Sequence, residues 1–333
     1  MQKRDYWKDK KIFITGATGF VGSWLTKELV DRDAEVTILM RDNIPNSSLI
    51  KSDYIKKINI VYGQLEDYFS ILRAINEYDI DIVFHLGAQA IVGRSTRNPI
   101  STFESNIKGT WNLLEAIRNC KSVDKTILST SDKAYGTHDK LPYTENMALK
   151  GEYPYDVSKS CADLIAQSYY KTYGLKIGIA RCGNIYGGGD LNFNRIIPGT
   201  IKSVYYKEQP VIRSDGLYIR DYIYVKDIIR SFMILCGNLD RKEVNGEPFN
   251  FSTGNRINVL DLVNLILKIM GSNLKPIILN QAVGEIRDQY LDISKAHRLL
   301  SLTPQYNVEH GLKETIKWYT SFFKQKHEKS KKF

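Results

Sequence analysis

The sequence predicts an α/β fold: a Rossmann-like doubly wound parallel sheet with a smaller mixed α/β lobe. Short apolar segments alternate with longer helical patterns from Lys11 to Arg181, which is the order that builds a parallel sheet with helices on both faces. The segments are apolar at nearly every position, as in strands that are buried on both sides. At 333 residues the chain is long enough for one large or two modest domains.

Six strands and three long helices are expected in this part of the chain. The strands are expected at 11–15, 35–39, 58–62, 81–86, 125–128 and 176–181, and the helices at 21–30, 102–119 and 155–173. In the helix at 102–119, Ile107, Trp111, Leu114 and Ile117 lie on one face, which is the spacing that predicts a helix. Because parallel strands are joined by right-handed crossovers, few other topologies remain.

The alternation of strands and helices ends after Arg181, and GNIYGGGD at 183–190 is expected to be a loop. Residues 1–182, completed by about 225–257, are therefore assigned to the sheet domain, and 183–224 with 258–333 to the smaller lobe. Helices are expected in the lobe near 260–270 and 311–323, while 225–251 is expected to return to the sheet.

Charge and hydropathy narrow the classes of function. The formal net charge is +10, but much of it lies in the tail at 324–332, which is expected to be solvated and partly frayed and lacks the interleaved aromatics of a nucleic-acid site. No apolar stretch is long enough to span a bilayer, and the first residues have no signal-peptide core. We expect a cytoplasmic protein that binds neither nucleic acid nor membrane and favours anionic small molecules.

Cysteine usage gives no sign of a metal or a disulfide framework. The four cysteines are widely spaced, at Cys120, Cys161, Cys182 and Cys236. They form no CxxC or cysteine–histidine cluster, so no metal site is expected, and reduced thiols agree with a cytoplasmic location.

The first turn between a strand and a helix is GATGFVG, with Gly16, Gly19 and Gly22. A glycine-rich turn lets backbone N–H groups approach a pyrophosphate, and the helix N-terminus adds partial positive charge. Its place at the start of an α/β alternation predicts dinucleotide binding, although the spacing is GxxGxxG rather than GxGxxG.

The second strand is followed by Arg41 and Asp42. An acidic residue at this point favours NAD because it binds the ribose 2′-hydroxyl, whereas arginine can clamp a 2′-phosphate. Since Arg41 comes first, NADP is the expected cofactor, and Asp42 keeps NAD as an alternative.

Tyr155 and Lys159 in YDVSK are four residues apart and share one face of a helix. A nearby ammonium is expected to lower the pKa of the phenol, which then accepts the proton of a sugar or alcohol hydroxyl while hydride leaves the same carbon. Ser131, in STSDKAYG after the fifth strand, is the third member of this candidate catalytic set.

With these motifs the chain resembles the extended short-chain dehydrogenase/reductases that act on nucleotide sugars. The matching motifs are GATGFVG, HLGAQ at 85–89, SNIKGT at 105–110, YDVSK, GNIYG at 183–187 and RDYIYVKD at 220–227. The segments YWKDKKIFITGATGFVGSWL and GGGDLNFNRIIP are similar to CDP-glucose 4,6-dehydratases. The triplet SDK at 131–133 is similar to both that group and the UDP-N-acetylglucosamine 4,6-dehydratases. A nucleotide-sugar 4-epimerase or reductase and a non-catalytic NADP-binding protein are the alternatives.

For a dehydratase, the resemblance implies roles for the catalytic set. Tyr155 removes the proton of the C4 hydroxyl, Ser131 binds the C4 oxygen, and Lys159 orients the cofactor ribose. Asp132 stands where dehydratases place the acid that protonates the leaving C6 hydroxyl. Many dehydratases then carry a glutamate as the C5 base, and this chain has Lys133. Lys133 and Tyr155 are therefore both candidates for the C5 base.

The resemblance also implies which residues bind the ligands. The cofactor is expected to contact the glycine turn and the following residues: Thr18, Phe20, Val21, Arg41, Leu65, Leu86, Gly87 and Ala88. The smaller, substrate-binding lobe is expected to hold the nucleotide sugar through Asn184, Arg195, Arg220 and Arg287. Arginine suits the pyrophosphate because its planar fork pairs two oxygens. The helices at 102–119 and 155–173 are expected to pair with those of a second copy, giving a homo-oligomer.

Overall fold

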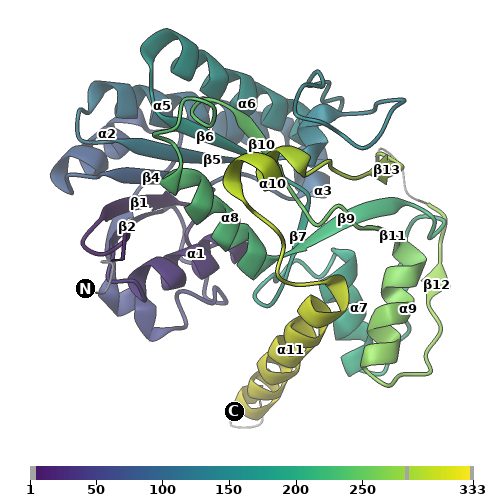
Figure 1. Cartoon of the computed structure of the whole chain (residues 1–333). Coiled ribbons are helices and arrows are strands. Elements are labelled where there is room, and N and C mark those ends of the chain that lie inside the picture. The colour runs from purple at the N-terminus through teal and green to yellow at the C-terminus, as the bar shows by residue number, and fades with distance from the viewer. Residues whose placement is uncertain (1–4, 282–284, 331–333) are drawn as a thin grey trace.

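The computed structural model describes residues 5–281 and 285–330 (Figure 1). Its larger part is a seven-stranded sheet with the order β10-β6-β5-β4-β1-β2-β3, in which every pairing is parallel. The strands are β1 (Lys11–Thr15), β2 (Glu35–Met40), β3 (Asn59–Tyr62), β4 (Ile82–His85), β5 (Lys125–Ser131), β6 (Ile177–Cys182) and β10 (Pro248–Phe251). The predicted fold class is confirmed, and the strand order reverses between β1 and β4.

Helices cover both faces of this sheet (Figure 1). One face carries α2 (Tyr68–Glu77), α5 (Gly109–Asn119) and α6 (Pro154–Tyr173), and the other carries α1 (Phe20–Val30) and α8 (Val225–Gly237). Neighbouring side chains of β1 point to opposite faces: Phe13 joins the core under α2 and α5, whereas Ile12 and Ile14 join the core under α1 and α8. The apolar strands predicted from the sequence are thus buried on both sides.

Two elements of the sheet domain differ from the expectation. β5 continues past Leu128 to Ser131 because its last residues keep pairing with β6, up to Ser131 opposite Cys182. The helix expected at 102–119 is interrupted: α4 (Pro99–Phe103) is followed by a π-helical turn, η2 (Glu104–Lys108), before α5 begins. Single π-turns of this kind are frequent at functional sites. The remaining short helices here are η1 (Asp53–Lys57), α3 (Val92–Arg97) and η3 (Asp132–Tyr135).

The smaller part is built around a mixed sheet of β7 (Asn184–Tyr186), β9 (Ile219–Tyr224), β11 (Arg256–Asn258) and β13 (Asp288–Gln289). Around it lie α7 (Ile196–Tyr205), α9 (Val259–Ile269), α11 (Val308–Ser330) and the strand pair β8 (Val211–Ile212) and β12 (Ile277–Ile278). The helix α10 (Ser294–Leu300) packs against β10 of the larger sheet instead. Residues 184–186, expected to be in a loop, form β7 because β9 offers them a parallel partner.

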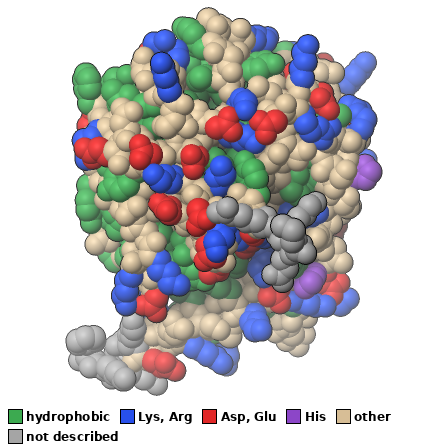
Figure 2. All heavy atoms as spheres, turned by 60° about the vertical axis from the view of Figure 1, so that its left-hand side comes forward, with side chains coloured by type: hydrophobic (Ala, Val, Ile, Leu, Met, Phe, Trp, Pro, Cys, Tyr) green, Lys and Arg blue, Asp and Glu red, His purple; other side chains and the backbone are tan. Residues whose placement is uncertain are grey.

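The charged tail is also more ordered than expected. Residues 324–330 continue α11 as helix rather than fraying, and 331–332 lie outside the described residues. On the face shown in Figure 2, basic and acidic side chains of the described residues are interspersed, and those in view form no basic patch of the kind that binds nucleic acid. Within residues 5–281 and 285–330, no helix has both the length and the apolar character needed to cross a bilayer.

Candidate active site

The glycine turn lies at the carboxyl end of β1 and opens α1. A side chain at Gly16 would collide with the backbone of Gly87 at 2.7 Å, and one at Gly22 would collide with the carbonyl of Gly16, so both glycines allow close backbone packing. Gly19 is the N-cap of α1 and contributes no capping side chain. Since the first N–H groups of any helix lack intrahelical partners, this turn suits the pyrophosphate of a dinucleotide.

The other predicted cofactor residues gather at the same edge of the sheet. Thr18, Phe20 and Val21 belong to the turn and the start of α1, Leu65 follows β3, and Leu86, Gly87 and Ala88 follow β4. The N–H of Gly87 donates to the hydroxyl of Thr15 at 3.0 Å, which ties the segment after β4 to β1. In doubly wound sheets this edge, at the point where the strand order reverses, is where ligands bind.

A buried histidine that sequence reasoning gave no role fixes this region. The hydroxyl of Thr110 donates to the carbonyl of Asn106, so it accepts from Nε2–H of His85, and Nδ1 of His85 then accepts from Thr15. Burial lowers the pKa of His85 to about 3, so the ring is neutral. In the sequence, His85 stands out only as the first residue of the HLGAQ motif. In the structure it is buried and links Thr15 of β1 to Thr110 of α5.

Arg41 and Asp42 follow β2 directly and bind one another. Nε of Arg41 donates to Oδ2 of Asp42 at 2.7 Å, and both side chains are exposed. An arginine and a carboxylate are thus both present where the ribose-binding residue was expected, and they are paired.

The triplet SDK forms a tight turn at the carboxyl end of β5. Ser131 caps the short helix η3: its hydroxyl accepts from the N–H of Lys133 at 3.3 Å and donates to Oδ1 of Asp132 at 3.0 Å. Asp132 is buried, and its Oδ2 has no hydrogen-bond partner among the described residues. Burial raises the pKa of Asp132, and Lys133 and Ser131 oppose that rise. The protonated acid is therefore favoured here more than in water.

Tyr155 and Lys159 both lie on α6 and are buried, as their spacing predicts. Burial raises the pKa of Tyr155 to about 12, and the charge of Arg195 and a hydrogen bond with Ser131 act against it. Nζ of Lys159 donates to the carbonyl of Ser129 at 3.0 Å, and burial lowers the pKa of Lys159 to about 8. The expected lowering of the Tyr155 pKa by Lys159 is therefore wrong for this structure, because burial dominates.

Lys133 has neighbours that the sequence did not reveal. Its Nζ donates to Oε1 of Gln289 at 3.1 Å, across from β13. Its charge lowers the pKa of Asp132 and of Asp156, the residue after Tyr155. Burial outweighs this effect at Asp156 and raises its pKa to about 6. Asp156 stands in the quoted YDVSK motif, but its approach to Lys133 depends on tertiary packing.

Of the four predicted substrate residues, two lie near the catalytic set, and the other two, Arg287 and Asn184, make no hydrogen bond or ion pair with it among the described residues. Arg195 and Arg220 lie near the catalytic set, since Arg195 lowers the pKa of Tyr155 and Arg220 that of Asp132. Arg195 also pairs with Asp190 at 2.9 Å. Arg220 is buried and donates to the carbonyl of Arg287 at 2.6 Å. The side chain of Arg287 is exposed.

Asn184 is the first residue of β7 and is half-buried. Its Nδ2 donates to the carbonyl of Asp221 at 3.4 Å, so its amide is engaged with β9 rather than with the catalytic set.

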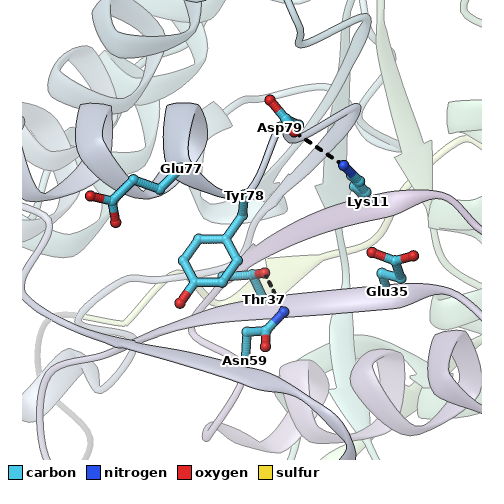
Figure 3. Close-up of a pocket in the computed structure, with 7 residues that line it drawn as sticks. All are labelled: Lys11, Glu35, Thr37, Asn59, Glu77, Tyr78 and Asp79. Carbon is cyan, nitrogen blue, oxygen red and sulfur yellow. Dashed lines mark hydrogen bonds and ion pairs between the residues drawn. The ribbon is translucent and has the colours of Figure 1, made fainter.

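A separate hollow lies at the opposite edge of the sheet (Figure 3). It is lined by Lys11, Glu35, Thr37, Asn59, Glu77, Tyr78 and Asp79, and Lys11, Glu35 and Asn59 begin their strands. Its volume of about 180 Å³ is below the range of most ligand pockets. The predicted cofactor and catalytic residues do not line this hollow. Among the described residues no group of three or more histidine, cysteine, aspartate or glutamate side chains is placed to hold a metal ion.

The sheet order, the glycine turn at its reversal point and the YxxxK helix beside it define a short-chain dehydrogenase/reductase of the extended type. The chain belongs to the family described as GDP-mannose 4,6 dehydratase, whose sequence model matches residues 13–315.

Known relatives carry out two kinds of reaction. The CDP-glucose 4,6-dehydratase of Salmonella typhimurium is 28% identical over 97% of this chain and 94% of its own length. The UDP-glucose 4-epimerase of Thermotoga maritima, solved with UDP-glucose, has a TM-score of 0.86 at 28% identity, covering 94% of this chain and 99% of its own. The dTDP-glucose 4,6-dehydratase of Streptomyces venezuelae, solved with NAD, has a TM-score of 0.84 at 25% identity, covering 94% and 97%. The chain is thus an enzyme of the nicotinamide-dependent nucleotide-sugar dehydratase and epimerase group.

Proposed function

We propose that this enzyme is a nucleotide-sugar 4,6-dehydratase, which converts an NDP-hexose to the NDP-4-keto-6-deoxyhexose with loss of water. The observation that carries the proposal is Asp132: a buried carboxyl with a raised pKa and an unpartnered Oδ2, beside Ser131 and Tyr155. The departure of a hydroxyl requires a proton donor, and burial favours the protonated form of this carboxyl. A 4-epimerase has no leaving hydroxyl and no use for such an acid.

The residues of the site have distinct roles in this proposal. Tyr155 accepts the proton of the C4 hydroxyl in its phenolate form, which Arg195 and Ser131 favour against the effect of burial. Ser131 hydrogen-bonds the C4 oxygen, and Lys159 hydrogen-bonds the cofactor ribose. The bound dinucleotide supplies the oxidation at C4 and the matching reduction at C6. The 4-keto group acidifies the C5 hydrogen, which is removed by Lys133 in its neutral amine form or by Tyr155 in its phenolate form. Asp132 protonates the departing C6 hydroxyl.

NADP is the proposed cofactor, with the first turn of α1 on its pyrophosphate and Arg41 on its 2′-phosphate. A bidentate arginine–phosphate pair is stronger than the exposed pair that Arg41 makes with Asp42. NAD is the alternative, since a structural relative was solved with it.

The substrate is proposed to be CDP-glucose or UDP-N-acetylglucosamine, held by Arg195, Arg220 and Arg287, with Asn184 at the start of β7. The similarity to a CDP-glucose 4,6-dehydratase supports the first of these sugars. The enzyme is proposed to work in the cytoplasm as a homo-oligomer. Support for the oligomer comes from α5 and α6, which expose Trp111 (44%) and Leu164 (54%).

The second candidate function is a 4-epimerase, which the similarity to the Thermotoga maritima enzyme favours. The test is a panel of nucleotide sugars incubated with enzyme and dinucleotide, with products read by mass spectrometry. A dehydratase releases one water per sugar, an epimerase leaves the mass unchanged, and a reductase consumes cofactor in proportion to product.

A further inference from the structure

Gln289 lies where the two parts of the molecule meet. It is the last residue of β13, it is fully buried, and it pairs in register with Arg220 of β9. Its Oε1 accepts a hydrogen bond from Nζ of Lys133 at 3.1 Å. The amide therefore links the smaller sheet to the turn that carries Asp132 and Lys133.

The other end of this amide has no partner among the described residues. Nε2 of Gln289 is buried and makes no hydrogen bond, and the same holds for Oδ2 of Asp132. Buried polar atoms are nearly always paired, so an unpaired one calls for an explanation, and a ligand that supplies the missing partner is one. The two unpaired groups flank Lys133: Asp132 precedes it in the chain, and Gln289 binds its Nζ.

We infer that Gln289 binds the C6 hydroxyl of the hexose through Nε2 while its Oε1 holds Lys133 in position. This inference rests on the proposed dehydratase function, in which Asp132 protonates the same hydroxyl. A hydroxyl oxygen has two lone pairs, so it accepts from both the protonated Oδ2 of Asp132 and the N–H of Gln289. One hydroxymethyl group of the substrate then satisfies both buried atoms.

The same contact persists as water leaves. The base takes the C5 proton, and the electrons of the C5–H bond form a C5–C6 double bond. The C6–O bond breaks with its electrons on oxygen, the proton of Asp132 joins that oxygen, and water forms. Gln289 keeps donating to this oxygen, and the new carboxylate of Asp132 lies beside Lys133, whose charge lowers its pKa.

The inference is tested by binding rather than by turnover alone. Calorimetry compares CDP-glucose and UDP-N-acetylglucosamine with their 6-deoxy analogues, on the wild type and on Gln289→Met and Gln289→Glu. The wild type is expected to prefer the 6-hydroxy sugar by about tenfold, since it makes two buried hydrogen bonds to that group. Both variants are expected to reduce this preference to about threefold or less, because each lacks the amide N–H.

The two variants separate the amide's two contacts. Gln289→Glu keeps an acceptor for Lys133, so it is expected to retain more kcat for water loss than Gln289→Met. Gln209→Leu is the matched control, since Gln209 is an exposed glutamine bound to the carbonyl of Lys275. This control should match the wild type in its preference for the 6-hydroxy sugar and in its kcat for water loss.

The outcomes distinguish this inference from the proposed function. An unchanged preference in both Gln289 variants overturns the role of Gln289 and leaves the dehydratase proposal standing. Equal binding of 6-hydroxy and 6-deoxy sugars by the wild type also overturns it. If the wild type leaves the mass of the sugar unchanged, the dehydratase proposal alone is contradicted. If the wild type binds neither nucleotide sugar, both the dehydratase proposal and the role of Gln289 are contradicted.

Discussion

The hydroxyl of Ser131 donates to Oδ1 of Asp132 at 3.0 Å and leaves Oδ2 of the same carboxyl buried without a partner in the described structure. One oxygen is thus held in place by the residue that also hydrogen-bonds Tyr155. The other oxygen is free to carry a proton. Because one carboxyl oxygen is hydrogen-bonded and the other is not, we assign Asp132 as the acid of a dehydration.

Asp132→Asn is expected to lower kcat for water loss by about 100-fold or more, because a positioned acid contributes about that much to a proton transfer. The KM should change little, since the amide keeps the size and the contact with Ser131. Steady-state kinetics on the accepted sugar measures both. Asp139→Asn, at an exposed site, is the control. If Asp132→Asn loses water with the same kcat as the wild type, the assignment of Asp132 as the acid is contradicted.

Asp156 is expected to make stability depend on pH. Its pKa is about 6 in the folded chain, against about 3.9 in an unfolded one. The folded state therefore holds the proton more tightly, and stability falls as pH rises from about 4 to about 6. For this buried group the loss is about 3 kcal/mol.

Urea unfolding of the wild type and Asp156→Asn at about pH 4 and pH 7.5 checks this dependence. The variant lacks the ionisation, so its stability relative to the wild type should improve at the higher pH. A difference between the two proteins that is the same at both pH values would show that Asp156 titrates normally.

Arg41→Ala is expected to weaken NADP binding by about tenfold and leave NAD binding nearly unchanged, because only NADP offers a 2′-phosphate to pair. Asp42→Ala should strengthen NADP binding by releasing Arg41 from its ion pair. Fluorescence titration with both dinucleotides measures the affinities of the wild type and of the two variants. Equal losses for both cofactors in Arg41→Ala would rule out a 2′-phosphate contact.

The oligomer is expected to depend on the apolar side chains that α5 and α6 expose. Leu164 is 54% exposed in the single chain, and a charge there is costly to bury without a partner. Sedimentation should give a multiple of the chain mass for the wild type and a smaller species for Leu164→Glu. Leu217→Glu, in the smaller part and 53% exposed, is the control. If the wild type sediments as a monomer, the proposed interface through α5 and α6 is wrong.

Local patterns were enough to predict the sheet, the glycine turn and the pairing of Tyr155 with Lys159 on one helix face. Each of these follows from residues close together in the chain. The surroundings of Lys133 were not predictable in this way, because Gln289 lies 156 residues further on and reaches Lys133 only through the pairing of β13 with β9. The raised pKa of Tyr155 was missed for the same reason, since burial depends on the whole fold.

The most direct test of the proposed reaction uses CDP-glucose and UDP-N-acetylglucosamine that carry oxygen-18 at C6. After incubation with enzyme and dinucleotide, mass spectrometry follows the label. The dehydratase proposal predicts that one of these sugars loses one water, that its product lacks the label, and that cofactor is not consumed. A product that keeps the label at unchanged mass would contradict the proposal and identify an epimerase.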